Sequence, residues 1–433
     1  MNENYNIFIN KKILIYGIGK SGISTFNFLK KNNKISLFDD NKKIRIDKIS
    51  RKIITSSSKI QKSKFDIIIL SPGIDINKCK LKKFLKKNSK IIYTDLDVFY
   101  SFYTNQCITI TGTNGKSTTC QLLYEVIKKQ GFDVKLAGNI GYPILSVKNI
   151  KHRSIFVIEA SSYQLDYSKL FNSKYAAILN ISADHLERHK TLKNYTSAKF
   201  KIIKNQKKNS IAFINKHDVH INKKIKKNNY KSKIIKVNTR LSDKFLGVFK
   251  NNYFLSSSNR ENLSFVLEIS KKLKIKKSIL IDVIRKFKGL KYRQQIIFDN
   301  KNISIINDSK STSYSSSLEM LKKSNNVYWL LGGIPKKGDK LNLSKFYYKN
   351  IKGFIFGKNY KKFSLDLKNK IKFKKYSNLK KALNGVFEDI KKDNSIKKTI
   401  LFSPAAASFD SFINFEDRGS YFNKLIKKYI NVR

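Results

Sequence analysis

The stretch Cys107-Ile-Thr-Ile-Thr111-Gly-Thr-Asn-Gly115-Lys-Ser-Thr118 joins an apolar run to a glycine-containing loop and then to a segment with helical spacing of apolar residues. The apolar run predicts a buried strand. A loop between a strand and a helix can present backbone N–H groups to phosphate. Here Lys116 is expected to hold β- and γ-phosphates, and the Ser117 hydroxyl is expected to reach Mg²⁺. The stretch therefore predicts a nucleotide-binding α/β domain.

This loop is shorter than the common phosphate-binding loop, because only Thr113 and Asn114 separate its two glycines. Its Gly-Lys-Ser-Thr core still lies between a predicted strand and a predicted helix. That context makes the loop the strongest local signal of function in the chain.

The same order of apolar run, small polar loop and helical segment recurs on both sides of this stretch. Continuous Val/Ile/Leu runs separated by helices predict parallel sheets that are covered on both faces. The predicted strands are Ile13–Tyr16, Ile67–Leu70, Ile108–Ile110, Ile155–Ile158, Ala177–Leu179, Ile303–Ile306, Val327–Leu331, Phe354–Phe356 and Thr399–Phe402.

The length of 433 residues suggests about two to three domains. Three blocks emerge from the pattern, at residues 1–97, 98–291 and 292–433. We expect an α/β protein with a Rossmann-like N-terminal domain, a central P-loop ATPase-like domain whose sheet is mainly parallel, and a C-terminal Rossmann-like α/β domain.

The chain is strongly basic, with 90 Lys+Arg against 30 Asp+Glu and a formal net charge of +60. Such a charge is typical of nucleic-acid binders. The lysines are spread along the whole chain, however, whereas a binding stripe would concentrate them. We therefore interpret most of the charge as solvated surface and expect no nucleic-acid partner.

Several features point to a cytoplasmic protein. No apolar run approaches the ~18 residues of a membrane-spanning helix, and no secretory signal is evident at the start of the sequence. The three cysteines, Cys79, Cys107 and Cys120, have no paired spacing, which fits a reducing compartment. We expect no membrane insertion and a monomer.

A second glycine loop, Gly17-Ile-Gly19-Lys-Ser-Gly22, follows the first predicted strand. Its G-x-G-x-x-G spacing lets a diphosphate approach the N-terminus of a helix. Asp39 and Asp40 end the next strand, where a ribose or base contact is expected. Alone, this block resembles a nicotinamide dehydrogenase, but any nucleotide with a diphosphate could use the same turn.

Candidate metal ligands follow two strands of the central block. Glu159 ends Ile155–Ile158, and Asp184-His185 follows Ala177–Leu179. Both should emerge at the carboxyl edge of a parallel sheet, beside the phosphate loop. A carboxylate and an imidazole there could hold nucleotide-bound Mg²⁺. The offset of Glu187 between His185 and His189 argues against a zinc helix.

Three loops of the last block have small polar residues directly after strands. They are Asn307-Asp-Ser-Lys-Ser-Thr312, Leu331-Gly-Gly-Ile-Pro-Lys-Lys-Gly-Asp339 and Ser403-Pro-Ala-Ala-Ala-Ser-Phe-Asp410. Such loops form ligand sites in open α/β sheets, although each pattern alone is weak.

Taken together and in this order, these motifs resemble the Mur ligase family, the ATP-dependent amino-acid-adding enzymes of peptidoglycan synthesis. The loop Thr111–Thr118 is general to that family. Asn307–Thr312 and the stretch from Ser403 to Gly419 are more specific to members that add D-glutamate. Tyr163 stands where relatives commonly have Phe.

The resemblance implies the residues of two nucleotide sites. The UDP-substrate would be held at positions matching Gly19, Ser21, Gly22, Asp39, Ser71, Pro72, Gly73 and Asn139. ATP would be held at positions matching Gly112, Thr113, Asn114, Gly115, Lys116, Ser117, Thr118, Asn262, Arg293 and Asp308. The first glycine loop thereby becomes a UDP-diphosphate turn.

The resemblance also implies a D-glutamate site and a metal site. D-Glutamate would be held at positions matching Lys310, Thr312, Lys336, Ser408 and Phe415. One or two Mg²⁺ ions would be held by Ser117, Glu159, His185 and Lys199, the last as a carbamate formed with CO₂. Lys201 is a neighbour that could be confused with Lys199. The catalytic residues would be Lys116, His185, Lys199 and Lys310.

The implied activity is ATP-dependent ligation of D-glutamate to UDP-N-acetylmuramoyl-L-alanine through an acyl phosphate. Three alternatives compete with it. Another ligase of the superfamily, such as a folylpolyglutamate synthase, would lack the first glycine turn. A dehydrogenase would leave Gly115-Lys116-Ser117 without a purpose, and a nucleic-acid-dependent NTPase would leave the loops of the last block unexplained.

Overall fold

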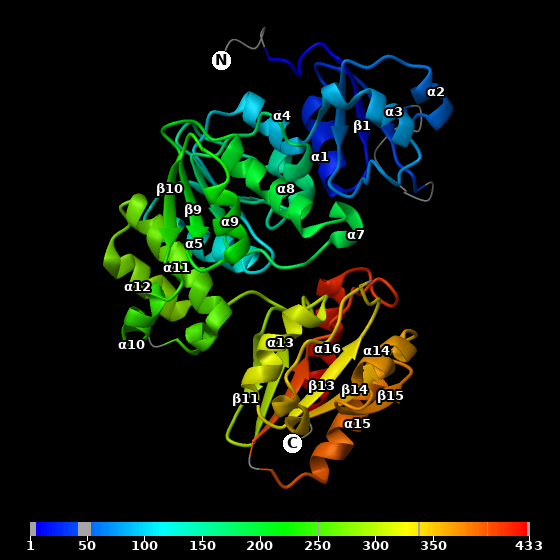
Figure 1. The fold of residues 1–433 in the computed structure, drawn as a ribbon, viewed down its shortest axis with the longest axis vertical. Helices are drawn as coiled ribbons and strands as arrows, with labels where there is room; N and C mark the ends of the chain where they lie inside the picture. The colour runs from blue at the N-terminus through cyan, green and yellow to red at the C-terminus, as the bar shows by residue number, and fades with distance from the viewer. Residues whose placement is uncertain (1–5, 42–52, 250, 337, 396, 431–433) are drawn as a thin grey trace. The chain divides into compact units, whose positions relative to one another are not determined.

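The computed structural model describes residues 6–41, 53–249, 251–336, 338–395 and 397–430. The chain forms two compact units, Met1–Phe287 and Lys288–Arg433. Within the described residues, the first unit contains a four-stranded and a six-stranded sheet, and the second unit contains another six-stranded sheet. Helices pack beside the sheets (Figure 1). The predicted α/β class is confirmed.

The first sheet is parallel, with strand order β2-β1-β3-β4. Its strands are β1 (Lys12–Tyr16), β2 (Lys34–Phe38), β3 (Ile67–Leu70) and β4 (Ile92–Tyr93). The helices of this part are α1 (Lys20–Leu29), α2 (Ser57–Gln61), α3 (Lys82–Lys87) and α4 (Asp95–Phe102).

The second sheet is also parallel, with strand order β10-β9-β8-β5-β7-β6. Its strands are β5 (Cys107–Thr111), β6 (Val134–Gly138), β7 (Ile155–Glu159), β8 (Tyr175–Ile178), β9 (Ile211–Asn215) and β10 (Lys233–Val237). Its helices are α5 (Lys116–Lys129), α6 (Ser162–Tyr167), α7 (Leu186–His189), α8 (Leu192–Lys204), α9 (Val219–Lys226), α10 (Leu246–Phe249), α11 (Ser257–Lys272) and α12 (Lys277–Lys286).

The sheet of the second unit has strand order β11-β12-β16-β13-β14-β15, and β11 alone pairs antiparallel. Its strands are β11 (Gln295–Asp299), β12 (Ile303–Asn307), β13 (Val327–Gly332), β14 (Ile351–Phe356), β15 (Lys372–Tyr376) and β16 (Lys398–Phe402). Its helices are α13 (Tyr314–Lys323), α14 (Tyr360–Leu367), α15 (Leu379–Lys391) and α16 (Phe415–Ile430). Short 3₁₀ helices cover Ser89–Ile91, Ile144–Ser146, Leu241–Phe245, Asn252–Leu255 and Lys345–Asn350.

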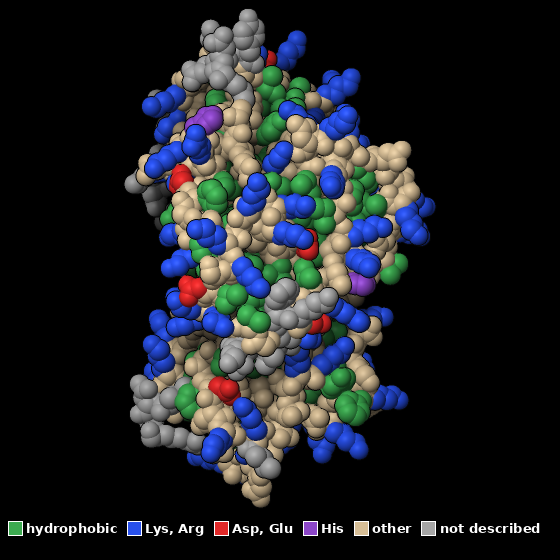
Figure 2. All heavy atoms as spheres, turned by 90° about the vertical axis from the view of Figure 1, so that its left-hand side faces the viewer, with side chains coloured by type: hydrophobic (Ala, Val, Ile, Leu, Met, Phe, Trp, Pro, Cys, Tyr) green, Lys and Arg blue, Asp and Glu red, His purple; other side chains and the backbone are tan. Residues whose placement is uncertain are grey.

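Lysine and arginine side chains are scattered over the face of the molecule shown in Figure 2, among hydrophobic and uncharged polar groups. This distribution agrees with the interpretation of the charge as diffuse. None of the helices in the described part of the chain combines the length and the apolar character that crossing a bilayer requires.

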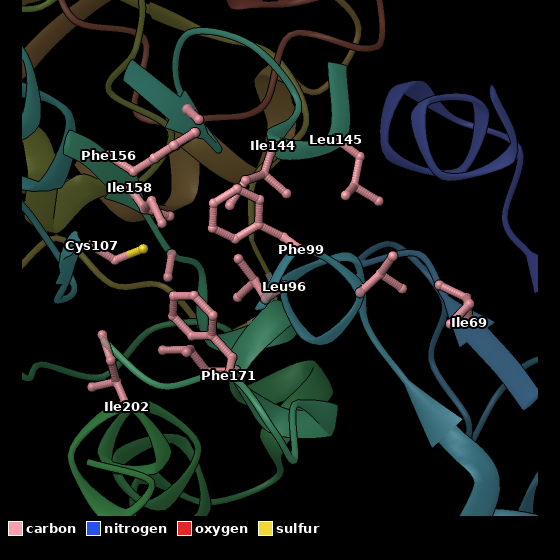
Figure 3. Close-up of a cluster of buried hydrophobic side chains, with 14 of the residues drawn as sticks. Ile69, Leu96, Phe99, Cys107, Ile144, Leu145, Phe156, Ile158, Phe171 and Ile202 are labelled. Carbon is pink, nitrogen blue, oxygen red and sulfur yellow. The ribbon is translucent and has the colours of Figure 1, made fainter. Parts of the chain in front are cut away.

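One hydrophobic core joins the first two sheets. It runs from Ile69 on β3 through Leu96 and Phe99 on α4 to Cys107 on β5 and Phe156 on β7 of the second sheet (Figure 3). The predicted boundary between residues 97 and 98 therefore falls inside helix α4, whose side chains belong to this shared core. The division into three domains remains a prediction.

Candidate active site

The predicted phosphate loop leads from β5 into α5 and turns at two glycines. Gly112 and Gly115 have φ angles of +155° and +83°, which favour glycine. A Cβ atom at Gly115 would lie only 1.9 Å from Oδ1 of Asn262 on α11. Glycine at this position therefore allows Asn262, the predicted adenine contact, to pack directly against the loop.

The ammonium group of Lys116 lies over this loop. Its Nζ donates hydrogen bonds to the carbonyl oxygens of Gly112 and Thr113, both at 2.8 Å. The loop is also tied to the end of β8, because Asn180 accepts from the backbone N–H groups of Thr113 at 2.9 Å and Asn114 at 2.8 Å. These contacts give the loop a defined shape around its lysine.

Two of the predicted metal ligands are in direct contact. The Ser117 hydroxyl donates to Oε2 of Glu159 at 2.6 Å, and the Asn139 amide donates to Oε1 at 2.8 Å. Only 1% of Glu159 is exposed. The structure thus brings Asn139, predicted to contact the UDP-substrate, to the same carboxylate as the Ser117 hydroxyl.

Lys199 projects from α8 to the phosphate loop. Its Nζ donates to the carbonyl oxygen of Gly112 at 2.7 Å and lies 4.5 Å from the centroid of the Tyr195 ring. Burial lowers the pKa of this amine well below its ordinary value, and the nearby charge of Lys116 lowers it further. Two of the three predicted catalytic lysines, Lys116 and Lys199, therefore meet at one carbonyl oxygen.

His185 is held by an aromatic neighbour. Its backbone is left-handed, with φ +55°, and its Nδ1 lies 2.7 Å from the Tyr163 hydroxyl on α6. The ring is 6.4 Å, centroid to centroid, from that of Tyr195, which also packs on Lys199. Tyr195 is thus a neighbour of both His185 and Lys199, two residues of the predicted metal site.

The donor set suits magnesium. Among the described residues, no group of three or more His, Cys, Asp or Glu side chains is placed to hold a metal ion. The predicted site differs from such a group, because a serine hydroxyl and a lysine carbamate would supply two of its ligands. The contact between the Ser117 hydroxyl and the Glu159 carboxylate already brings together two oxygen donors of the kind that Mg²⁺ prefers.

Apart from Asn139, which follows β6 of the second sheet, the predicted UDP-substrate residues gather at the carboxyl edge of the first sheet. Ser71 donates through its hydroxyl to the carbonyl oxygen of Gly17 at 2.6 Å, and Asp39 accepts from the Ile18 N–H at 2.7 Å. Ser21 donates to the buried carboxylate of Asp95 at 2.5 Å. Gly19 lies in the loop after β1, Pro72 and Gly73 lie in the loop after β3, and Gly22 lies in the first turn of α1.

In the second unit, the predicted amino-acid site centres on Phe415. Lys310 Nζ lies 3.9 Å from the centroid of its ring, and the guanidinium of Arg293 lies 6.0 Å from it. Thr312, Lys336 and Ser408 lie in the loops that follow β12, β13 and β16. Lys310 and Arg293 therefore share the ring of Phe415 as a neighbour.

Asp308, a predicted nucleotide contact, is buried directly after β12. It accepts hydrogen bonds from the Gln294 N–H at 3.1 Å and from the Ser403 hydroxyl at 3.0 Å. Burial raises the pKa of its carboxyl to about 7, against the opposing effect of these hydrogen bonds.

Three residues of these sites were not assigned a role from sequence. Tyr163 was noted only as a departure from relatives, and Asp95 carries no local signal. Arg418 lies within the last motif, but arginine is mostly an exposed residue type, so its position in the sequence predicts no buried role. Each acts through a partner distant in the chain, at separations of 22, 74 and 109 residues, so only the folded structure reveals it.

Comparison with known proteins gives a consistent result. Residues 11–93 match the family described as Mur ligase MurD-like, N-terminal domain, and residues 110–279 match the Mur ligase middle domain. The UDP-N-acetylmuramoylalanine–D-glutamate ligase of Rickettsia prowazekii is 34% identical, covering 98% of this chain and 99% of its own. The same-named enzyme of Buchnera aphidicola from Schizaphis graminum is 36% identical with the same coverage.

Solved structures show the same fold at low sequence identity. A MurF ligase of Thermotoga maritima in complex with ADP has a TM-score of 0.55 at 14% identity, over 99% of this chain and 100% of that one. The UDP-N-acetylmuramate–alanine ligase MurC of Thermotoga maritima has a TM-score of 0.53 at 15% identity, over 98% and 100%.

Proposed function

The chain belongs to the Mur ligase family, and on this premise we propose that it joins D-glutamate to UDP-N-acetylmuramoyl-L-alanine, with ATP as the source of activation. The names of its relatives over nearly the full chain support this substrate pair. We propose that residues 1–97 bind the UDP-substrate, residues 98–291 bind ATP and residues 292–433 bind the amino acid.

One observation carries the ligase proposal on the structural side. Lys116 and Lys199 both donate to the carbonyl oxygen of Gly112, while Ser117 of the same loop contacts Glu159. Two lysine amines and two predicted metal ligands thus lie at a loop whose N–H groups can receive phosphate. Such a site suits transfer of a phosphoryl group between two anions, because it neutralises their mutual repulsion.

The reaction has two covalent steps. A carboxylate oxygen of the L-alanine residue attacks the γ-phosphorus of ATP, and the bond to ADP breaks, which gives an acyl phosphate. The amine of D-glutamate then attacks the carbonyl carbon, loses a proton and expels phosphate. Lys116 would hold the β- and γ-phosphates and stabilise the negative charge that develops on them.

Ser117, Glu159, His185 and a carbamate on Lys199 would hold Mg²⁺. When bound, Mg²⁺ neutralises phosphate charge and orients the phosphate oxygens. The lowered pKa of Lys199 favours the neutral amine, the form that attacks CO₂. The new N–C bond forms with loss of a proton, so a buried neutral amine becomes an anionic oxygen donor near Glu159.

The second unit would hold D-glutamate. Lys310 lies against Phe415, which favours a defined position for its ammonium group. An ammonium group so placed can pair with a carboxylate of the amino acid. We propose that Thr312, Lys336, Ser408 and Phe415 complete this site, and that Arg293 and Asp308 serve the nucleotide.

We also propose that the reaction takes place in the reducing cytoplasm, where free thiols such as those of Cys79 and Cys107 persist.

The decisive experiment measures phosphate release with UDP-N-acetylmuramoyl-L-alanine and ATP, with D-glutamate or L-glutamate added. We expect release and a new amide bond only with D-glutamate. Equal rates with both enantiomers, or activity only with another amino acid, would assign the chain to a different ligase of the superfamily.

A further inference from the structure

Arg418 is an arginine with no exposed surface, on the first turn of α16. Its guanidinium donates four hydrogen bonds, each to a neutral oxygen. Nε reaches the Ser309 hydroxyl at 3.1 Å, and Nη2 reaches the carbonyl oxygens of Ser309 at 2.7 Å and Ala406 at 3.0 Å. Nη1 reaches the carbonyl oxygen of Gly332 at 3.4 Å.

The three residues that accept these hydrogen bonds lie at the last residue of a strand or just after it, and the strands are adjacent in the sheet. The sheet order places β16 between β12 and β13, and Ser309, Ala406 and Gly332 lie at the carboxyl ends of β12, β16 and β13. One side chain therefore links three loops that sequence separates by as many as 97 residues (309 to 406).

Each of these loops carries a residue proposed to bind D-glutamate. Ser309 precedes Lys310, Gly332 begins the loop that contains Lys336, and Ala406 lies two residues before Ser408. The fourth segment is the start of α16 itself, which carries Phe415. The Ser309 hydroxyl donates to the carbonyl oxygen of Phe415 at 2.8 Å, so this segment is joined to the same group.

The backbone around the guanidinium is shaped to receive it. At Gly333, with φ +126°, a Cβ atom would lie 3.1 Å from Nη1 of Arg418 and 2.3 Å from the carbonyl oxygen of Ala407. Ala405 adopts a left-handed conformation, with φ +57°, beside Ala406. Conformations of this kind persist only where the surrounding contacts impose them.

Burial of a guanidinium group is unfavourable unless its N–H groups are satisfied. Burial lowers the pKa of Arg418 to about 10, which still leaves the group charged at neutral pH, while Asp410 and Asp308 favour the charge from nearby. Packing alone would be served by an apolar side chain of similar volume. The planar guanidinium group of Arg418, with its N–H groups pointing in fixed directions, instead orients several carbonyl groups at once.

We propose that Arg418 is a positioning residue for the amino-acid substrate, which holds the loops after β12, β13 and β16 in the single arrangement that lets Lys310, Lys336, Ser408 and Phe415 meet D-glutamate. This inference rests on the proposed function. Arg418 does not touch the substrate, because it has no exposed surface.

A positioning role and a purely structural role predict different kinetics. Displaced loops would weaken use of D-glutamate while leaving the activation of UDP-N-acetylmuramoyl-L-alanine by ATP intact. A structural role would only reduce the amount of folded enzyme, so every KM would stay unchanged.

The test compares the full-length wild type with Arg418→Lys, which keeps the charge but cannot form the four-bond fork. KM is measured separately for D-glutamate, ATP and UDP-N-acetylmuramoyl-L-alanine. We expect KM for D-glutamate to rise on the order of 10- to 100-fold, with the other two within about twofold. Phosphate release with hydroxylamine, which can capture the acyl phosphate without the D-glutamate site, should be unchanged.

Two further variants complete the test. Ile426→Ala removes a buried side chain from the same helix, two turns further on, and should lower stability without moving KM for D-glutamate. Ser309→Ala removes one partner of the fork and should raise that KM several-fold even if Arg418→Lys fails to fold. Folding of the second unit is followed by Trp329, the single tryptophan of the chain.

The results of these assays distinguish failure of the proposed function from failure of the positioning role of Arg418. A wild-type enzyme without D-glutamate-dependent phosphate release refutes the proposed function. A wild-type enzyme that is active with D-glutamate, together with folded Arg418→Lys or Ser309→Ala enzymes whose three KM values match the wild type, refutes the positioning role alone.

Discussion

Lys199 and Lys201 lie two residues apart on α8, yet their amines meet different surroundings. Lys199 is 1% exposed and contacts the phosphate loop at Gly112. Lys201 projects to Asp166, whose backbone carbonyl oxygen accepts its hydrogen bond and whose carboxylate lies 3.9 Å away. Two residues along a helix are about 200° apart around its axis, so only one of the two side chains can face the loop.

If Lys199 carries the carbamate, ligation should depend strongly on Lys199 and much less on Lys201. Lys199→Ala should abolish ligation, and a short carboxylate such as formate should restore part of it by supplying the missing oxygen ligand. Wild-type enzyme in ¹³C-bicarbonate should give a carbamate signal by NMR that the variant lacks. A fully active Lys199→Ala enzyme without rescue would refute the role, and Lys201→Ala is the matched control.

Lys116 should matter to turnover and not to folding. Lys116→Ala removes the ammonium group from the phosphate loop and should lower the rate of ligation on the order of 100-fold or more. Its melting temperature should stay close to that of the wild type, because the hydrogen bonds of this group to Gly112 and Thr113 are local to the loop. Lys129→Ala, at the exposed end of the same helix, should keep normal activity. Near-normal turnover of Lys116→Ala would exclude the phosphate-loop assignment.

Asp308 should make the stability of the second unit depend on pH. Its pKa is about 7 when folded and about 3.9 when unfolded, so the folded state retains a proton that the unfolded state releases between these values. Below about pH 4, Asp308 therefore contributes its full share to the free energy of unfolding. This contribution, on the order of 4 kcal/mol, is lost as the pH rises through 7. Asp308→Asn removes this dependence.

The measurement is urea unfolding at pH 5 and pH 8, followed by the fluorescence of Trp329. This residue is buried in the second unit, and its indole donates to the carbonyl oxygen of Ser403 at 2.7 Å. The wild type should lose more free energy of unfolding between the two pH values than Asp308→Asn does. Equal losses in both proteins would mean that Asp308 is ionised in the folded state.

Sequence reasoning reached the residues whose chemistry is local. Lys116 and Ser117 could be predicted because a strand, a glycine loop and a helix adjoin in the chain. The hydrogen bonds of Tyr163 to His185 and of Arg418 to three loops could not, because they depend on how distant segments pack.

At the scale of elements, helix α4 joins the first two sheets through one carboxylate. Oδ2 of Asp97 accepts from the N–H and hydroxyl of Thr94, which caps the helix. Oδ1 accepts from the Ser168 hydroxyl and from the N–H groups of residues 169–171. The side chain has no exposed surface, so all of these donors depend on it.

Asp97→Ala should therefore destabilise the first unit by about 3 kcal/mol or more, because several buried donors lose their acceptor. Thr94→Ala, which removes one of the donors, should cost less. Urea unfolding followed by far-UV circular dichroism checks this, while the Trp329 transition of the second unit should not move. A loss below about 1 kcal/mol would show that the donors find other partners.

The strands that sequence reasoning found and missed differ in position within the sheets. Continuous apolar runs such as Ile67–Leu70 and Thr399–Phe402 are central strands buried on both faces. The edge strands β10 and β15 carry lysines among their apolar residues and are partly exposed. Lysine on an edge strand discourages pairing with other chains. The same lysines interrupt the run of apolar residues from which a strand is predicted, so the sequence does not indicate these strands. Interior strand β9 is not among the predicted strands either.

At the scale of the whole molecule, the net charge of +60 is not gathered into a stripe on the face in Figure 2. Diffuse positive charge still attracts polyanions such as ATP over a distance set by ionic strength. We expect KM for ATP to rise between about 0.02 and 0.3 M salt, as screening shortens that distance. Steady-state kinetics across this range is the measurement. A flat profile would leave the charge without a role in substrate capture.

The core that runs from β3 through α4 to β7 limits where related genes can recombine and still encode a folded protein. A segment with its own core can be exchanged between related genes and still fold, because its apolar surface is buried internally. Leu96 and Phe99 instead bury their surface among residues from both sheets of the first unit. Recombination near residue 97 would separate these partners, so the first 287 residues are expected to pass between lineages as one piece.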